Sequence, residues 1–180
     1  MADLMRAAEE LFASVGYDAT TMSGIAHLAG ASIGSLYQFF PSKESIGGAL
    51  LLGYIAELND QLEQWRAALP STPSALAREL INIVLDYVSR NPACRVLAET
   101  PSLVPESYGM EQFSNSVQNV LGTFSPSMRD AELSAVGLTT SLMVRAAVQG
   151  SRMVDANKSA LLRKEMQQAL GSYLEMRLGD

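Results

Sequence analysis

Residues 20–46 read TTMSGIAHLAGASIGSLYQFFPSKESI, and this stretch decides the fold of the first part of the chain. Thr21, Ser32 and Ser42 each stand where a hydroxyl can cap the start of a helix. Gly30 suits a left-handed turn, and the proline before Ser42 blocks continuation of the preceding helix. The stretch therefore predicts two short helices joined by a tight turn, with a further helix after them.

The apolar residues of this stretch predict which side of each short helix is buried. Ile25 and Leu28 are expected to face a core, and Leu36 and Phe40 to anchor the later helix from behind. Ala26 is small enough for the two helices to touch, as a helix-turn-helix requires. The residues left on or near the outward face are Ser32, Ile33, Gly34, Ser35, Tyr37 and Gln38.

The rest of the chain also reads as helical, because apolar residues recur at spacings of three and four almost everywhere. We expect an all-α protein of about nine helices, with residues 1–45 as a helix-turn-helix domain and residues 46–180 as a second helical domain. The last two helices are expected over about 128–155 and 158–178. Their short connection predicts an antiparallel hairpin.

Composition limits the classes of function. The chain has 180 residues, of which 48% are apolar and 18% charged, a balance typical of globular proteins. No uninterrupted apolar run is long enough to span a membrane and the N-terminus lacks a secretory pattern, so we expect a cytoplasmic protein with no membrane contact. One cysteine, Cys94, and one histidine, His27, leave no disulfide and no conventional zinc site, and we expect neither metal nor cofactor.

Three runs carry a resemblance to a known family. They are Ala-Ala-x-x-Leu-Phe-x-x-x-Gly-Tyr from residue 7, Ile-Ala-x-x-Ala-Gly-Ala-Ser from residue 25, and Leu-Tyr-x-x-Phe-x-Ser-Lys from residue 36. Together they closely resemble the DNA-binding signature of TetR-family transcriptional regulators, over about residues 4–50. The rest of the chain is similar to that family only in layout.

The resemblance implies roles for individual residues. Tyr37, Lys43 and Thr21 would hold DNA phosphates, and positions from Ser32 to Gln38 would include the base-reading side chains. It also implies a homodimer on a palindromic operator and release by a small-molecule effector; repression is expected by analogy with the family alone. Phosphate contacts fix register, whereas Ile33 could read a thymine methyl group and Gly34 permit close approach.

The charge of the first domain is unusual for a DNA-binding module. Residues 1–45 contain two basic residues, Arg6 and Lys43, against five acidic ones, a balance of −3. Because affinity for DNA grows mainly from neutralised phosphates, we expect few ionic contacts and weak nonspecific binding. An alternative is therefore open: a helical small-molecule sensor or sequestering dimer whose DNA-binding module is weakened.

The second domain predicts a dimer surface and an effector pocket. In the helix over about 128–155, Leu138, Leu142 and Ala146 are expected to face their own domain, and a stripe of smaller residues that includes Val136 and Thr140 to face a second copy. Large apolar residues that could line a pocket are Tyr54, Trp65, Tyr87, Met110, Phe113 and Met143. The chain has no Gly-rich phosphate loop and no Ser/His/Asp set, so we do not expect an enzyme.

Overall fold

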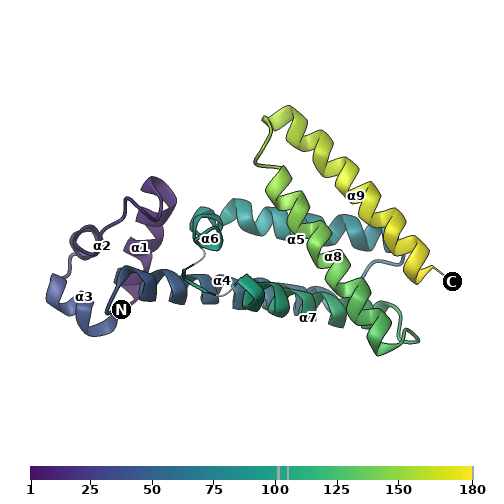
Figure 1. The fold of residues 1–180 in the computed structure, drawn as a ribbon, viewed down its shortest axis with the longest axis horizontal. Helices are drawn as coiled ribbons and strands as arrows, with labels where there is room; N and C mark the ends of the chain where they lie inside the picture. The colour runs from purple at the N-terminus through teal and green to yellow at the C-terminus, as the bar shows by residue number, and fades with distance from the viewer. Residues whose placement is uncertain (101, 105, 180) are drawn as a thin grey trace. The chain divides into compact units, whose positions relative to one another are not determined.

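The computed structural model describes residues 1–100, 102–104 and 106–179, and it confirms the all-helical prediction. Within these residues the helices run as follows (Figure 1): α1 Ala2–Val15, α2 Met22–Leu28, α3 Ile33–Phe39, α4 Lys43–Arg66, α5 Pro73–Arg90, α6 Pro92–Ala98, α7 Glu106–Phe124, α8 Asp130–Gly150 and α9 Ala156–Leu178.

The chain forms two compact units that do not follow the sequence order. The first contains residues 1–57 and 88–109, and the second contains residues 58–87 and 110–180. Helices α4 and α5 each contribute to both units. The functional division predicted between residues 45 and 46 remains a prediction.

The first unit is built on α1, which packs against α2 and α6. Leu4, Ala8 and Phe12 lie one turn apart on α1 and are fully or almost fully buried, so one face of the helix supplies the core. The Tyr54 hydroxyl of α4 donates to Glu9 Oε1 at 2.7 Å and ties α4 to α1. Gly16, at φ 85°, ends α1.

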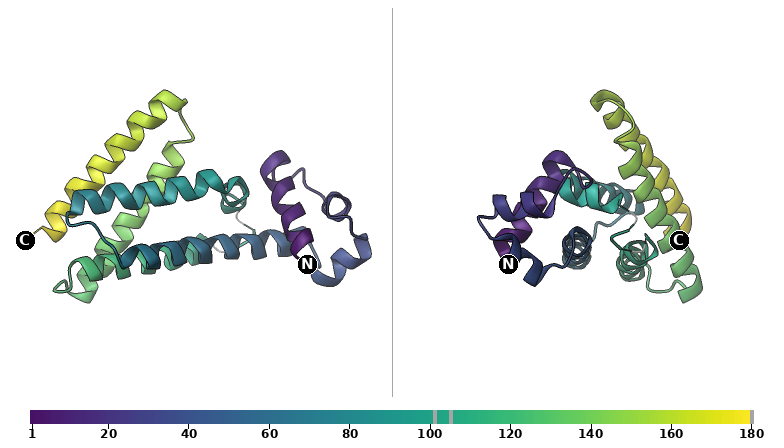
Figure 2. Two further views of the ribbon diagram at one scale, coloured as in Figure 1. Left: turned by 180° about the vertical axis from the view of Figure 1, so that it is seen from behind. Right: turned by 60° about the vertical axis from the view of Figure 1, so that its left-hand side comes forward.

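The second unit buries one face of each of its long helices. In the views of Figures 1 and 2, α8 and α9 lie side by side, and the two helices are in contact. The predicted hairpin is therefore confirmed, but α8 ends at Gly150 rather than near residue 155. Asp155 Oδ1 accepts a hydrogen bond from Lys158 N at 3.0 Å and caps α9, so the turn occupies the residues before it.

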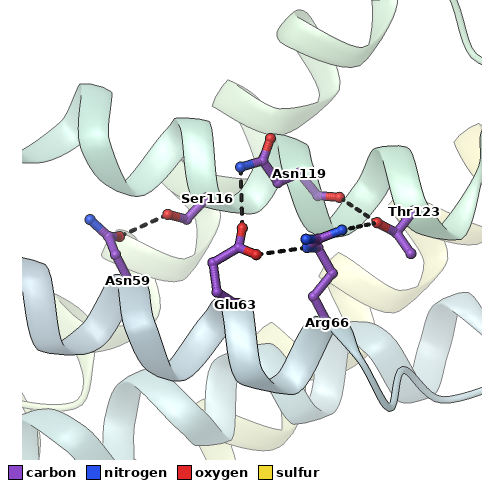
Figure 3. Close-up of polar contacts among 6 residues, drawn as sticks. All are labelled: Asn59, Glu63, Arg66, Ser116, Asn119 and Thr123. Atoms are coloured by element: carbon purple, nitrogen blue, oxygen red, sulfur yellow. Dashed lines mark hydrogen bonds and ion pairs between the residues drawn. The ribbon is translucent and has the colours of Figure 1, made fainter.

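Polar side chains join α4 to α7 within the second unit. Ser116 Oγ donates to Asn59 Oδ1 at 3.0 Å, and one turn further along Asn119 Nδ2 donates to Glu63 Oε1 at 3.3 Å. Arg66 Nε donates to the second Glu63 oxygen at 2.8 Å, which holds the pKa of that carboxyl below its usual range. Figure 3 shows this ladder, whose sixth member is Thr123. The contacts fix the register of the two helices.

The inward and outward faces of α8 are the reverse of the prediction. Val136, Thr140 and Val144 are buried, whereas Leu138 and Leu142 are 46% and 50% exposed. The reason is close packing: a Cβ added at Gly137 would overlap Gln118 Cγ of α7, so only small side chains fit this contact. Among the described residues α8 is the one helix long and apolar enough to cross a membrane, by length and composition only, and a third of its apolar window is buried.

Candidate nucleic-acid interface

The turn between α2 and α3 is closed by a glycine in the left-handed conformation. Gly30 has φ 64°, and its N–H donates to His27 O at 3.1 Å while Ala31 N donates to Ala26 O at 2.9 Å. This pair of bonds is a Schellman motif, which satisfies carbonyls at the end of α2. The backbone is thereby turned sharply into α3, and the predicted role of Gly30 is confirmed.

Two hydroxyls cap the short helices as predicted. Thr21 Oγ1 accepts from Gly24 N at 3.0 Å, and Ser32 Oγ accepts from Ser35 N at 3.1 Å. A hydroxyl that accepts one hydrogen bond still has its own hydrogen to donate. Both side chains are exposed, so each has a donor available for an oxygen of a bound molecule.

One face of α3 is buried and the other is open. Leu36 and Phe40 are buried, as predicted, and hold α3 against the first unit. Ile33 and Tyr37 lie one turn apart and are 41% and 52% exposed. Ser32, Gly34 and Gln38 are also exposed, whereas Ser35 is half-buried. The open face of α3 therefore offers hydroxyl, amide, aliphatic and aromatic groups and no charge.

One apolar residue near the turn was assigned wrongly. Leu28 was expected to face the core beside Ile25, but Ile25 is fully buried and Leu28 is 44% exposed. Leu28 is the last residue of α2, where the chain already bends into the turn. The spacing of apolar residues marks a helix face less reliably at the end of a helix this short.

Lys43 does not point away from the protein. Its ammonium donates to the backbone carbonyls of Tyr17, Asp18 and Thr20, at 2.7, 3.2 and 2.9 Å. An ammonium has three hydrogens, so in this geometry none is left for a phosphate. The structure thus differs from the phosphate contact that the resemblance implied for Lys43. Sequence reasoning missed the contact of Lys43 with residues 17–20, because nothing in the spacing shows that the two segments meet.

The remaining charges of the module confirm that its surface is poor in cations. Arg6 pairs with Asp3 at 2.9 Å, and both side chains are exposed. The pKa of the Glu44 carboxyl lies below its usual range, chiefly because it accepts a hydrogen bond from its own backbone N–H, so it is negatively charged at neutral pH. His27 is exposed on α2.

The residues predicted to line an effector pocket are divided between the two units. Tyr54 belongs to the first unit, where its hydroxyl is bound to Glu9. Trp65 and Tyr87 belong to the second: Trp65 Nε1 donates to Glu79 Oε2 at 3.0 Å, and Tyr87 is buried. Met110, Phe113 and Met143 are half-buried in the second unit. The pocket remains a prediction.

Cys94, the single thiol, has the environment of a structural residue. Burial raises its pKa to about 11, and the nearby Glu57 carboxylate adds to the effect. A thiol with so high a pKa is protonated at neutral pH and is a poor nucleophile. Among the described residues no group of three or more His, Cys, Asp or Glu side chains is placed to hold a metal ion.

The fold and the α2–α3 geometry define a class of protein, the helix-turn-helix regulators with a helical second part. Comparison of this sequence with known proteins points to the same class. Residues 4–50 match the family described as "Bacterial regulatory proteins, tetR family". The HTH-type transcriptional regulator RutR of Escherichia coli K12 is 34% identical over 117 residues, which cover 59% of this chain and 52% of RutR. The chain thus matches about half the length of this relative.

Solved structures share the fold along almost the whole chain. A TetR-family transcriptional regulator from Streptomyces coelicolor superposes with a TM-score of 0.76 at 21% identity, over 98% of both chains. The transcriptional regulator FadR from Bacillus subtilis, solved in complex with stearoyl-CoA, gives 0.72 at 16% identity, over 95% of this chain and 97% of that one. Residues 4–50 thus match the TetR family of transcriptional regulators, and the whole chain shares the fold of these solved structures.

Proposed function

We propose that the protein is a DNA-binding transcriptional regulator, a repressor that leaves its palindromic operator when a small molecule binds. One observation carries the proposal: α3 is held from behind by Leu36 and Phe40 while Ile33, Tyr37 and Gln38 face outward. A helix of this kind enters the major groove of a helix-turn-helix complex, where side chains reach base edges. A protein that binds operator DNA must be where the DNA is, which is consistent with the cytoplasmic location that we expect.

The base contacts that this helix supports are not ionic. Ile33 offers methyl groups that fit the methyl group of thymine, Gln38 offers an amide that can bond adenine, and Gly34 removes a side chain where the backbone would approach. Thr21, Ser32, Ser35 and Tyr37 can donate their hydroxyl hydrogens to phosphates. Recognition by such groups predicts a shallow dependence on salt.

A homodimer on the α8–α9 face completes the proposal. Leu138, Leu142, Leu161 and Met176 are exposed on these two helices by 46%, 50%, 61% and 76%, and a second copy that packs on α8 and α9 would cover them. Residues on α8 and α9 of two chains would make a four-helix interface with two-fold symmetry. A two-fold dimer presents its two α3 helices to half-sites about 34 to 36 Å apart, or a multiple of that distance.

Regulation would follow from a shift between two conformations of the dimer. An effector bound within residues 46–180 that favours the conformation with widely spaced α3 helices by about 1 to 3 kcal/mol would weaken operator binding roughly 5- to 150-fold. The stearoyl-CoA in the Bacillus subtilis FadR structure makes long-chain acyl-CoA the first class of ligand to test.

A second candidate is favoured by a specific observation, the charge of the module. Residues 1–45 carry a balance of −3, and the Lys43 ammonium is bound to backbone carbonyls. A helical sensor, or a dimer that sequesters a relative, with a weakened DNA-binding module would have both properties. Such a protein would bind a small molecule and no DNA.

Selection from a random pool of duplex DNA at low salt separates the two candidates. The regulator predicts enrichment of a palindrome whose half-sites have the spacing given above. The same selection with Ile33→Asp and Tyr37→Asp combined should enrich nothing, because both changes place a charge on the open face of α3. A folded wild-type protein that enriches no sequence would contradict the proposal and favour the sensor.

A further inference from the structure

The Lys43 ammonium sits among the backbone carbonyls of the segment that joins α1 to α2. Its three bonds, at 2.7, 3.2 and 2.9 Å, reach carbonyls spread over residues 17–20. The Tyr17 carbonyl also accepts from Thr20 N at 3.3 Å, and the ammonium adds one donor that all three carbonyls share. Lys43 is the first residue of α4, so the start of α4 holds the segment that leads into α2.

The Tyr17 ring forms a second contact with the same ammonium. Lys43 Nζ lies 4.5 Å from the centre of the Tyr17 ring, within the range of a cation–π interaction. Tyr17 is itself fixed, because its ring stacks on Phe12 of α1 with centroids 5.3 Å apart and it is only 8% exposed. The segment is further closed by Thr20, whose Oγ1 donates to Gly16 O at 2.7 Å.

The start of α4 is equally well ordered. Ser42 Oγ accepts from Ser45 N and Ser45 Oγ accepts from Ser42 N, both at 3.2 Å, so the two serines cap the helix reciprocally. Lys43 therefore extends from a fixed backbone to a fixed ring. The next residue after the segment it binds is Thr21, the cap of α2 and a donor that we propose for a phosphate.

We infer that Lys43 is a positioning residue: it fixes residues 17–20 and thereby places Thr21 and the start of α2, and it does not itself hold a phosphate. This inference rests on the proposed function of the α2–α3 surface. A phosphate contact would require the ammonium to leave three carbonyls and an aromatic ring, and the part-buried carbonyls of Tyr17 and Thr20 would lose this donor. Loss of Lys43 would then weaken DNA binding without removing an ionic contact.

Two substitutions separate positioning from phosphate binding. Lys43→Met keeps the length of the side chain and removes its charge and its donors. Lys43→Arg keeps the charge, but a planar guanidinium cannot direct donors at carbonyls arranged around an ammonium, whereas it binds phosphate at least as well as lysine does. If Lys43 positions residues 17–20, both variants should bind operator DNA weakly. If Lys43 binds a phosphate, only Lys43→Met should bind operator DNA weakly.

The measurement is the affinity for the selected operator as a function of salt concentration, at a temperature where each variant is folded. We expect both variants to bind roughly tenfold more weakly than wild type, with the slope of log K against log salt unchanged. A wild-type affinity for Lys43→Arg, together with a slope reduced by about 0.9 in Lys43→Met, would overturn the inference. Arg6→Met, which removes an exposed cation of α1, is the matched control for a general loss of charge.

Amide hydrogen exchange tests the same inference without DNA. If Lys43 holds the segment, exchange of the amides of residues 17–24 should become faster in both variants, while the amides of α8 and α9 keep their wild-type rates. Unchanged exchange over 17–24 would contradict the inference. Failure of the wild-type protein to bind any DNA would instead contradict the proposed function, and the exchange result would still decide how residues 17–20 are held.

Discussion

At the scale of the residue, Gly16 and Gly30 have positive φ, at 85° and 64°, and no other described residue does. Space is not the constraint at either position, because a Cβ would meet no atom within 4 Å. The backbone conformation alone requires glycine there. Gly53 is the converse case: a Cβ would again meet nothing within 4 Å, but Gly53 lies inside α4 with ordinary helical geometry.

Substitution of Gly30 and of Gly53 by alanine should therefore change the free energy of unfolding in opposite directions. Gly30→Ala should lower the free energy of unfolding by about 1 to 2 kcal/mol, because a Cβ is strained in the left-handed region. Gly53→Ala should raise it by about 0.4 to 1 kcal/mol, because alanine restricts the unfolded chain and favours a helix. Urea denaturation measures the free energy of unfolding of both variants. A change of the same sign in both would contradict the left-handed conformation of Gly30.

The Tyr17 hydroxyl is buried, and the Glu44 carboxylate lies near it. Burial raises its pKa from 10.0 to about 12, and the Glu44 carboxylate adds to this by its charge. Between pH 10 and 12 the unfolded chain has lost this proton and the folded chain has kept it. The unfolded state then binds fewer protons, so the stability contributed by neutral Tyr17 is complete below pH 10 and is lost as pH rises.

Tyr17→Phe should remove that alkaline loss. Thermal unfolding followed from neutral pH to about pH 11 should show a smaller decrease in Tm for the variant than for wild type. Tyr37→Phe alters an exposed ring and is the matched control, which should follow wild type. An equal decrease in all three proteins would show that Tyr17 does not titrate as its burial implies.

Sequence alone identified the residues whose role is local. Thr21, Ser32 and Gly30 act on their own helix ends, so the order of residues is sufficient to predict them. Lys43 acts on a segment more than 20 residues earlier in the chain, and no local pattern reveals such a contact. The open face of α3 is also a local property, because it follows from the period of a single helix, and it was therefore predictable in the same way as the caps.

At the scale of the element, the packing of α8 on α7 explains the reversed faces. Gly137 of α8 lies so close to Gln118 that a Cβ would overlap the side chain near its base. Periodicity showed that α8 is apolar on two sides, but not which side its own unit covers. The side of α8 with small residues is the side that packs closely on α7. Hydrophobicity alone does not distinguish that side from the other.

Two glycines at the α7–α8 contact should respond differently to alanine. Gly137→Ala should destabilise the protein by about 1 to 3 kcal/mol, because Gln118 must leave its position. Gly122→Ala is the matched control on α7: its Cβ would meet only the end of the Leu133 side chain, at 3.2 Å, which can move. Chemical denaturation of both variants decides the point, and an equal response would mean that α7 and α8 are not in close contact at Gly137.

At the scale of the whole molecule, the proposed dimer depends on the exposed leucines of α8. Leu142→Glu should convert the dimer to a folded monomer, because a charge would be buried at the centre of the apolar face. Leu52→Glu alters an equally exposed leucine of α4 and should leave the dimer intact. Sedimentation equilibrium measures both masses. A dimeric Leu142→Glu protein would show that the interface lies elsewhere.

The solved structures with the same fold support the helix arrangement of this chain more strongly than they support any one class of effector. The two superposed structures cover nearly the whole chain at 21% and 16% identity, so the helix order is shared although most side chains differ. The sequence therefore predicted the fold and the α2–α3 surface, whereas the identity of the effector requires measurement.

The central claim is that the uncharged face of α3 reads the operator, and fluorescence anisotropy with the selected duplex and a scrambled one tests it most directly. Ile33→Ala removes methyl groups that we propose to contact thymine, and it should weaken binding to the operator about tenfold while leaving the scrambled duplex unaffected. The same loss on both duplexes, or no loss on either, would contradict the account.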